Sequence, residues 1–310
     1  MKHYYTKQLF KRGILVRTEA DELLEGSIDL HAHIYPQVFI EEPGRVRDHE
    51  WAELAIQAGM RGFVMKSHLW PTMAQASLIN QVYKDFNAIG SIVLNSNVGG
   101  ISPFAAESAT RLGAKVIWMP TYTSKNDIEI GAYSKQIETA YKQPPPNKNL
   151  SIFGKDGKIT EDVNSILEIA RDANVAIATG HLSAEEGVAL AKRAKEIGLK
   201  KFIFTHPIIS IINATEEQLL EVSNLGYFIE FTWISAFPMW QGLDPLLVAE
   251  TAKKIGAHKC LMTTDAQLDW NPPPPEMLRM FIASMLRIGL KSKEIRLMVQ
   301  ENPSRLVDLY

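Results

Sequence analysis

Cysteine is nearly absent from this chain of 310 residues, since Cys260 is the single example. One thiol can form neither an intrachain disulfide framework nor a cysteine-rich metal site. Long apolar runs are missing as well: no stretch approaches the roughly 18 uncharged apolar residues that a membrane helix needs. Met1–Arg17 also lacks the apolar core of a signal peptide. These absences favour a cytoplasmic protein that makes no use of a membrane.

An excess of charge of either sign is also absent. The formal net charge is -2 with 22% charged residues, which gives no support for a nucleic-acid partner or a membrane-surface partner. A hydrophobic share of 46% is ordinary for a globular protein and excludes a disordered chain. The length permits either one large domain or two small ones.

Short apolar runs are what the chain does have, and most are separated by segments with helical periodicity. The runs are too short for helices and too uniformly apolar for half-exposed strands, which is typical of buried parallel strands. The eight runs are Ser27–Leu30, Gly62–Met65, Ser91–Leu94, Lys115–Met119, Val175–Thr179, Lys201–Thr205, Tyr227–Glu230 and Lys259–Thr263. Eight strands alternating with helices predict an α/β protein with a single-domain (β/α)8 TIM barrel. A doubly wound open sheet is the alternative.

Two segments fall outside the repeating units of the predicted barrel, which spans residues 27–310. Residues 1–26 form an N-terminal arm, which covers the bottom of the barrel or contacts a neighbouring subunit in a homo-oligomer. Residues 121–160 form an insert after the fourth strand, in which the turn signal Asp156-Gly157 predicts a small hairpin. Because it follows a strand, the insert belongs on the carboxyl face of the barrel, as a lid or as a solvated excursion.

Histidine is the residue whose positions are most informative. Five of the eight histidines stand at or just beyond the ends of predicted strands, namely His31, His33, His68, His181 and His206. Asp265 stands in the same place after the eighth strand. The carboxyl ends of barrel strands meet at one mouth, so residues far apart in the chain are expected to converge there.

The pair His31 and His33 is two residues apart on one strand, so both side chains point to the same face. Two imidazoles on one face can bind a metal ion. His181, His206 and Asp265 would complete a nitrogen and oxygen set suited to Zn²⁺ or another divalent ion. Each histidine taken alone is better explained as a satisfied polar residue at a strand end, but the ordered set favours a metal site.

This order of ligands resembles the amidohydrolase superfamily of metal-dependent barrels. The paired histidines follow the first strand, single histidines follow the fifth and sixth, and Asp265 follows the eighth. The closing segment Asn302–Leu306 is also similar to the end of many members. The resemblance implies one or two metal ions, with Asp265 binding metal and taking the proton of an activated water. His206 or His181 would ligate metal or stabilise developing charge.

The fourth strand departs from that family. Binuclear members usually carry a bridging carboxylated lysine or a glutamate there, whereas this strand ends in Trp118–Pro120. Lys66 on the second strand is the candidate replacement. Three interpretations stay open: a carboxylated Lys66 bridges two metal ions, its ammonium binds a substrate carboxylate or phosphate, or it is a structural ion-pair partner.

Aromatic and polar residues just beyond the strand ends form the predicted pocket, which suits a small organic substrate with an apolar part. The predicted substrate contacts are Tyr35, His68, Trp70, Asn95, Tyr122, Glu230 and Trp233. Three functions are compatible with this pattern. The first is a metal-dependent hydrolase of an amide, lactone, cyclic imide or phosphoester. The others are a single-metal decarboxylase, lyase or isomerase, and a non-catalytic metal-binding barrel.

Overall fold

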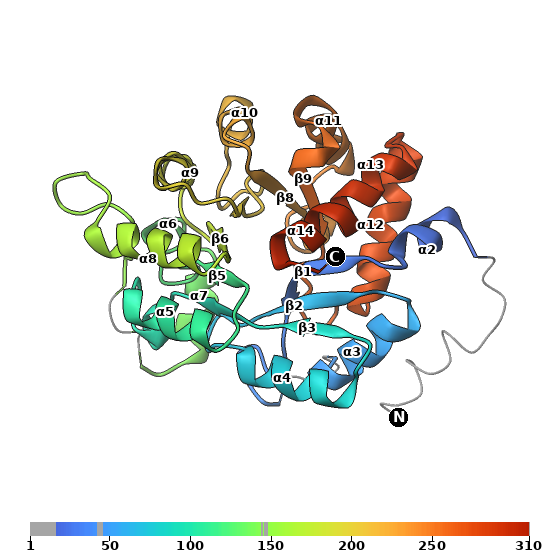
Figure 1. The fold of residues 1–310 in the computed structure, drawn as a ribbon, viewed down its shortest axis with the longest axis horizontal. Coiled ribbons are helices and arrows are strands. Elements are labelled where there is room, and N and C mark those ends of the chain that lie inside the picture. The colour runs from blue at the N-terminus through green and yellow to red at the C-terminus, as the bar shows by residue number, and fades with distance from the viewer. Residues whose placement is uncertain (1–16, 42–45, 144, 146–147, 310) are drawn as a thin grey trace.

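Parallel strands surrounded by helices make up the fold in a computed structural model that describes residues 17–41, 46–143, 145 and 148–309 (Figure 1). The strands are β1 Ile28–His33, β2 Gly62–Lys66, β3 Asn87–Ile89, β4 Ser91–Val93, β5 Val116–Trp118, β6 Ala176–Ala178, β7 Phe202–Phe204, β8 Phe228–Thr232 and β9 Cys260–Thr263. They form two parallel sheets, β1 to β3 and β4 to β9, in which each strand pairs with its neighbour in the chain.

The ring closes between the last strand and the first. Ala32 and Ala266 form a parallel bridge, and the N–H of Asp265 donates to the carbonyl of His31 at 2.9 Å. This contact confirms the predicted (β/α)8 barrel, because an open sheet would leave β1 and β9 as separate edges.

The third barrel strand is divided at Gly90, which the sequence pattern did not predict. Its first half, β3, pairs with β2, and its second half, β4, pairs with β5. Thr72 replaces the missing partner, since its N–H donates to the carbonyl of Ser91 at 3.0 Å and its Oγ1 accepts from the N–H of Ser91 at 2.8 Å. A Cβ on Gly90 would lie 2.7 Å from the Cα of Met73, so only glycine permits this approach.

Helices cover the outside of the barrel. They are α3 Asp48–Gln57, α4 Met73–Val82, α5 Pro103–Arg111, α8 Glu161–Asp172, α9 Ala184–Ile197, α10 Glu216–Asn224, α11 Pro245–Ile255 and α12 Pro274–Ile288. Local signals fix their ends. Ser183 and Glu186 form a reciprocal capping box at the start of α9, and Gly198 ends that helix with a left-handed φ of 86°.

The bottom of the barrel is filled by the end of the chain. After α13 (Ser292–Arg296) and a π-helical turn (Leu297–Glu301), helix α14 (Asn302–Val307) packs Leu306 and Val307 into the interior cluster that contains Ile28 and Leu30. Most of the remaining buried apolar side chains lie between the strands and the outer helices. The barrel is therefore closed at the bottom, and the opposite end is where this fold places its sites.

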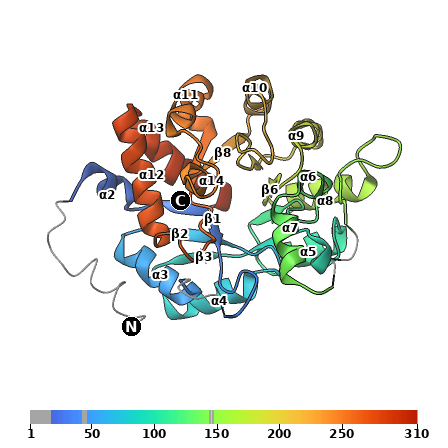
Figure 2. The same cartoon turned by 180° about the vertical axis from the view of Figure 1, so that it is seen from behind.

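The predicted insert forms two short helices, α6 (Lys125–Ile130) and α7 (Tyr133–Ala140), beside α5 and α8 (Figure 2). An antiparallel bridge between Phe153 and Ile159 surrounds the predicted Asp156-Gly157 turn. Of the predicted N-terminal arm, residues 1–16 lie outside the described residues. The rest contains α2 (Glu19–Leu24), which packs beside α12. No helix in the described ranges has the length and apolar character needed to cross a membrane.

Candidate metal centre

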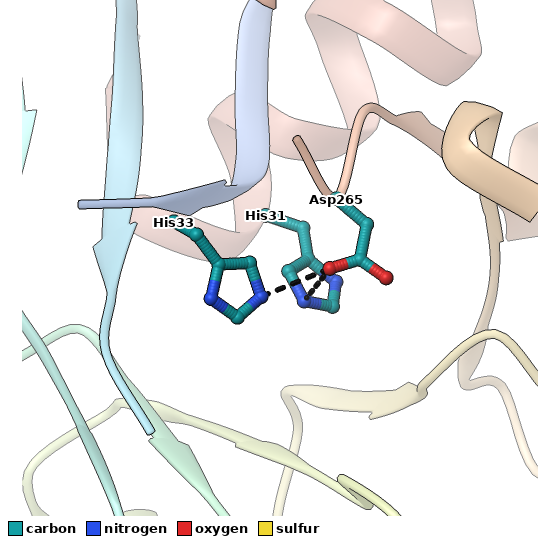
Figure 3. Close-up of side chains that lie close together, drawn as sticks. All are labelled: His31, His33 and Asp265. Carbon is teal, nitrogen blue, oxygen red and sulfur yellow. Dashed lines mark hydrogen bonds and ion pairs between the residues drawn. The ribbon is translucent and has the colours of Figure 1, made fainter. Parts of the chain in front are cut away.

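Two histidines of β1 and the aspartate after β9 form a compact buried cluster. The Nε2 atoms of His31 and His33 lie 3.0 and 2.9 Å from the same atom, Oδ1 of Asp265. One ligand atom from each residue lies within 4.8 Å of the others. Figure 3 shows the three side chains pointing toward one another from the two strand ends. Two imidazole nitrogens and a carboxylate oxygen at this spacing fit a single divalent ion.

A buried carboxylate holds the two strand ends in register. Oδ1 of Asp29 accepts from the N–H of His31 at 3.0 Å and from the N–H of Thr264 at 3.2 Å, while Oδ2 accepts from the hydroxyl of Thr264. The pairing of β1 with β2 shifts between Asp29 and Ala32, as in a β-bulge. Burial raises the pKa of Asp29 to about 6, against the opposing bonds from Thr264 and His31. Asp29 therefore ties the segment of His31 to that of Asp265.

The second ring nitrogens of both cluster histidines are also engaged. Nδ1 of His31 lies 3.2 Å from Oε1 of Glu230, and Nδ1 of His33 lies 2.8 Å from the amide of Gln37. A carboxylate partner such as Glu230 accepts from Nδ1–H and leaves the lone pair of Nε2 facing the metal. Glu230, predicted as a substrate contact, thus lies behind a metal-directed imidazole. Its Oε2 atom is buried with no hydrogen-bond partner among the described residues.

Lys66 lies at the cluster. Its Nζ is 2.8 Å from Nε2 of His31 and 4.5 Å from the ring centre of Trp118, and the side chain is fully buried. Burial lowers the pKa of Lys66 to about 8, although the charges of Asp265 and Glu230 oppose this. The replacement predicted on the second strand therefore sits where it can act on a bound ion or on a substrate.

His181 and His206 lie beside the cluster, but they are not among the three residues whose ligand atoms lie within 4.8 Å of one another. The ring of His206 lies 5.8 Å from that of His31 and 5.3 Å from that of His181. Nδ1 of His181 lies 2.6 Å from Oδ2 of Asp127, on helix α6 of the insert. Nδ1 of His206 is buried with no hydrogen-bond partner among the described residues, and its φ of 29° is left-handed. Ligation by these two histidines stays a prediction.

The surroundings of the site favour neutral imidazoles and an ionised carboxylate. Burial lowers the pKa of His33 to about 3 and holds the pKa values of His68 and His206 well below their ordinary value. Burial raises the pKa of Asp265. The charge of His31 and its hydrogen bond to Asp265 more than offset burial and hold the pKa of Asp265 well below its usual range. Neutral imidazole and ionised carboxylate are the forms that bind metal.

His31 is the exception among these histidines. Burial lowers its pKa, but the nearby charge of Asp265, supported by Glu230, more than offsets burial, and the pKa is raised. A divalent ion between His31 and Asp265 would supply the positive charge that a proton provides otherwise.

His68 and Asn95 join the barrel to the insert. Nδ1 of His68 lies 2.7 Å from Oγ1 of Thr121, and its ring lies 4.7 Å from that of His33 and 4.4 Å from that of Tyr133. Nδ2 of Asn95 donates to the carbonyl of His68 at 3.0 Å, and its Oδ1 accepts from the N–H of Thr121 at 2.8 Å. Asn95 therefore holds two loops of the mouth together, and a substrate contact by it stays a prediction.

The other predicted pocket residues are spread around the mouth. Tyr122 is buried, its hydroxyl donates to Asn97 at 2.9 Å, and burial raises its pKa to about 12. Trp233 is buried with its ring 4.9 Å from that of Phe281. Trp70 packs against the outer core, and Tyr35 carries the guanidinium of Arg47 over its ring at 5.1 Å.

A small cavity lies near the site. It has a volume of about 20 Å³ and lies beside His33, between Trp51 and the segment from Ala266 to Pro274. A single water needs about 10–15 Å³, so this space suits water rather than an organic molecule. A cavity of about 430 Å³ lies elsewhere, between α4 and α5 beside β3. Its lining contains none of the predicted site residues, so it has no part in the chemistry of the metal centre.

Sequence reasoning missed Asp127, Gln37 and Thr121. Gln37 lies beyond the end of β1 and outside any helix, so no regular period predicts where its side chain points. Asp127 lies inside the insert, where its place depends on how α6 packs. The only local signal is the cap of that helix, in which Ser124 accepts from the N–H of Asp127 at 3.1 Å.

Solved structures of several enzymes share this architecture over nearly their whole length. An amidohydrolase from Pseudomonas aeruginosa superposes with a TM-score of 0.59 at 13% identity, over 93% of this chain and 98% of that chain. An organophosphorus hydrolase from Deinococcus radiodurans gives 0.59 at 15%, over 93% of both chains. A 2,6-dihydroxybenzoate decarboxylase from Rhizobium gives 0.53 at 12%, over 92% and 99%.

These identities are low, so the similarity concerns the fold, and it confirms the predicted resemblance to the amidohydrolase superfamily at that level. No curated protein matches the chain. Residues 26–230, well over half of the sequence, match one family directly. The chain therefore belongs to the family described as "Family of unknown function (DUF6282)".

Proposed function

We propose that this protein is a metal-dependent hydrolase of a small organic substrate, acting on an amide, lactone, cyclic imide or phosphoester. The observation that carries the proposal is the cluster of His31, His33 and Asp265. Its two Nε2 atoms converge on one carboxylate oxygen in a buried setting. We further propose zinc as the ion, because a set of imidazole and carboxylate ligands with an open position is typical of catalytic zinc.

A bound divalent ion would supply an activated water and would polarise the carbonyl or phosphoryl oxygen of the substrate. Asp265 would handle the proton in this chemistry. Its Oδ1 faces the two imidazoles, while Oδ2 points away from both rings (Figure 3). In the proposal Oδ2 accepts the proton of the attacking water and returns it to the leaving group. The low pKa of Asp265 keeps its carboxylate ionised.

His206 and Lys66 are the candidates for stabilising charge on the substrate. Nδ1 of His206 has no partner among the described residues, unlike Nδ1 of His31, His33 and His181. An imidazole whose nitrogen is not otherwise engaged can hydrogen-bond a developing oxyanion. The Nζ of Lys66 can bind a carboxylate or phosphate of the substrate, provided that it is not carboxylated.

A decarboxylase using one metal ion is the second candidate. The observation in its favour is Trp118, which is fully buried at the end of β5, where binuclear relatives are expected to bridge two ions. An indole cannot bridge two cations. With Lys66 as an ammonium, the site would hold one ion and a positive group able to bind a carboxylate.

Metal dependence tests the first proposal. The purified protein is assayed against esters, lactones, amides, imides and phosphoesters before and after removal of metal by a chelator, and again after Zn²⁺ is restored. We expect His31→Ala and Asp265→Asn to abolish turnover, whereas His49→Ala, on the exposed face of α3, leaves it unchanged. Full turnover by metal-free protein would rule the proposal out.

Two measurements separate the alternatives. Turnover in ¹⁸O-labelled water places the label in the product of a hydrolase but not in that of a decarboxylase. Metal counting with and without bicarbonate then decides the state of Lys66. Two ions that depend on bicarbonate would support the carboxylated lysine, and one ion with unmodified Lys66 would exclude it.

A further inference from the structure

Residues of the insert contact both the ring and the backbone carbonyl of His181. Oδ2 of Asp127 lies 2.6 Å from Nδ1 of the imidazole. The hydroxyl of Ser124 and the amide of Asn126 donate to the carbonyl of His181 at 3.0 and 3.1 Å. Three residues of one short segment thus contact a single residue of the barrel. This concentration of contacts indicates that the insert takes part in the site.

Asp127 is itself fixed in place. The side chain is fully buried, and its Oδ1 accepts from the N–H of Ser134 at 2.6 Å, at the start of α7. Both carboxylate oxygens therefore face nitrogen atoms. An ionised carboxylate can only accept hydrogen bonds, so in the neutral form of the His181 imidazole the proton is on Nδ1. The lone pair is then left on Nε2.

We propose that Asp127 is a positioning residue that fixes the tautomer of His181, so that Nε2 is presented to the metal centre. The inference rests on the proposed metal-dependent function. It assigns the insert a part in the site: the carboxylate of α6 acts on the metal through the imidazole of the barrel. Glu230 has the corresponding place behind His31, but from within the barrel itself.

The substitution Asp127→Asn is the sharpest test, because the asparagine side chain has the same shape as the aspartate side chain. Both partners of Asp127 are nitrogen atoms, and the backbone N–H of Ser134 can only donate. In Asp127→Asn the amide oxygen is expected to stay with Ser134, which turns the NH₂ group toward His181. Nδ1 of His181 must then accept, and the proton moves to Nε2. A single atom exchanged in the insert would thereby remove the lone pair from the metal-facing nitrogen.

The tautomer is measured directly by ¹⁵N NMR of the histidine side chains in metal-free protein, with His181→Gln identifying the signal. We expect the Nδ1–H form in the wild type and the Nε2–H form in Asp127→Asn. An Nε2–H form in the wild type would overturn the proposal, whether or not any variant folds. This measurement needs no metal, so it stands apart from the test of the hydrolase function.

Affinity for Zn²⁺, measured by competition with a chromophoric chelator, gives the second readout. Loss of such a partner typically weakens metal binding about 10–100-fold, and we expect Asp127→Asn to fall in that range. Asp156→Ala is the matched control, since it removes an exposed carboxylate from the hairpin of the same insert. Unchanged Zn²⁺ affinity in Asp127→Asn would refute the positioning role. A wild type that binds no Zn²⁺ would instead refute the metal-dependent function. The NMR measurement would still decide whether Asp127 fixes the tautomer of His181.

Discussion

Gly180, the residue before His181, offers a quantitative test of how tightly the site is built. Its φ of 60° is left-handed. A Cβ built there would lie 2.4 Å from the carbonyl oxygen of Met119 and 2.8 Å from that of Pro120. Both obstacles are backbone atoms at the end of β5, so neither can rotate away as the tip of a side chain could. Gly180→Ala should therefore suffer strain and overpacking together.

The magnitude follows from two separable costs. A left-handed conformation costs a residue other than glycine about 1–2 kcal/mol, and overpacking a filled interior costs about 1–3 kcal/mol more. Gly198→Ala isolates the first cost, because Gly198 has a φ of 86° but nothing within 4 Å of its Cβ position. We expect Gly198→Ala to lose about 1–2 kcal/mol of unfolding free energy and Gly180→Ala about 2–5 kcal/mol.

Urea unfolding at neutral pH measures both variants, and the comparison holds if the m-value is unchanged. Gly180→Ala should also weaken Zn²⁺ binding, because the N–H of His181 donates to the displaced carbonyl of Pro120 at 3.0 Å. Equal losses of stability in the two variants would refute the reasoning. They would show that the carbonyls of Met119 and Pro120 move aside at no cost in free energy.

Three further substitutions test interactions away from the metal. Burial raises the pKa of Asp308, but its hydrogen bond to Lys201 at 2.7 Å and the charges of Lys201 and Lys115 more than offset this and lower it. A carboxyl group whose pKa is lower in the folded than in the unfolded protein stabilises the fold at pH values above its unfolded pKa. The stability lost by Asp308→Asn, about 1 kcal/mol for this partly exposed pair, should therefore be full at pH 7. In urea titrations it should begin to shrink as the pH falls below about 4 and should vanish only below the lowered native pKa; a loss independent of pH would contradict the ion pair. Asn302→Ala leaves two buried carbonyls at the start of β9 without their donor and should cost about 2–4 kcal/mol in urea unfolding, with a cost below about 1 kcal/mol counting against it. Ser183→Ala removes the N-cap of α9 and should lower the thermal midpoint through a loss of about 1 kcal/mol, whereas an unchanged midpoint would show that the cap is dispensable.

Much of the barrel could be predicted because its signals are local. A short apolar run needs only its own residues to be recognised as a buried strand, and the capping box of Ser183 and Glu186 at the start of α9 is equally local. The pairing of His31 with His33 followed from the two-residue period of a strand. Asp265 could be placed beside them because a closed barrel brings its first and last strands together.

The rest depends on contacts between distant segments. The division of the third strand at Gly90 arises from the approach of Met73, and the shift in β1 depends on Asp29 bonding to Thr264. Asp127 could not be found because the packing of the insert decides its partner. The individual roles in the site, a cytoplasmic location, a homo-oligomer and the lid all remain predictions.

The last helix of the described chain has a consequence for the order of events during synthesis. Leu306 and Val307 fill the interior beside Ile28 and Leu30, and β1 also needs Ala266 to close its free edge. The first strand therefore cannot be completed until synthesis has passed Val307. Contacts of such long sequence separation slow folding and leave an unpaired strand edge exposed meanwhile. A nascent chain would thus depend on protection of that edge, by chaperones or by transient pairing, until the ring can close.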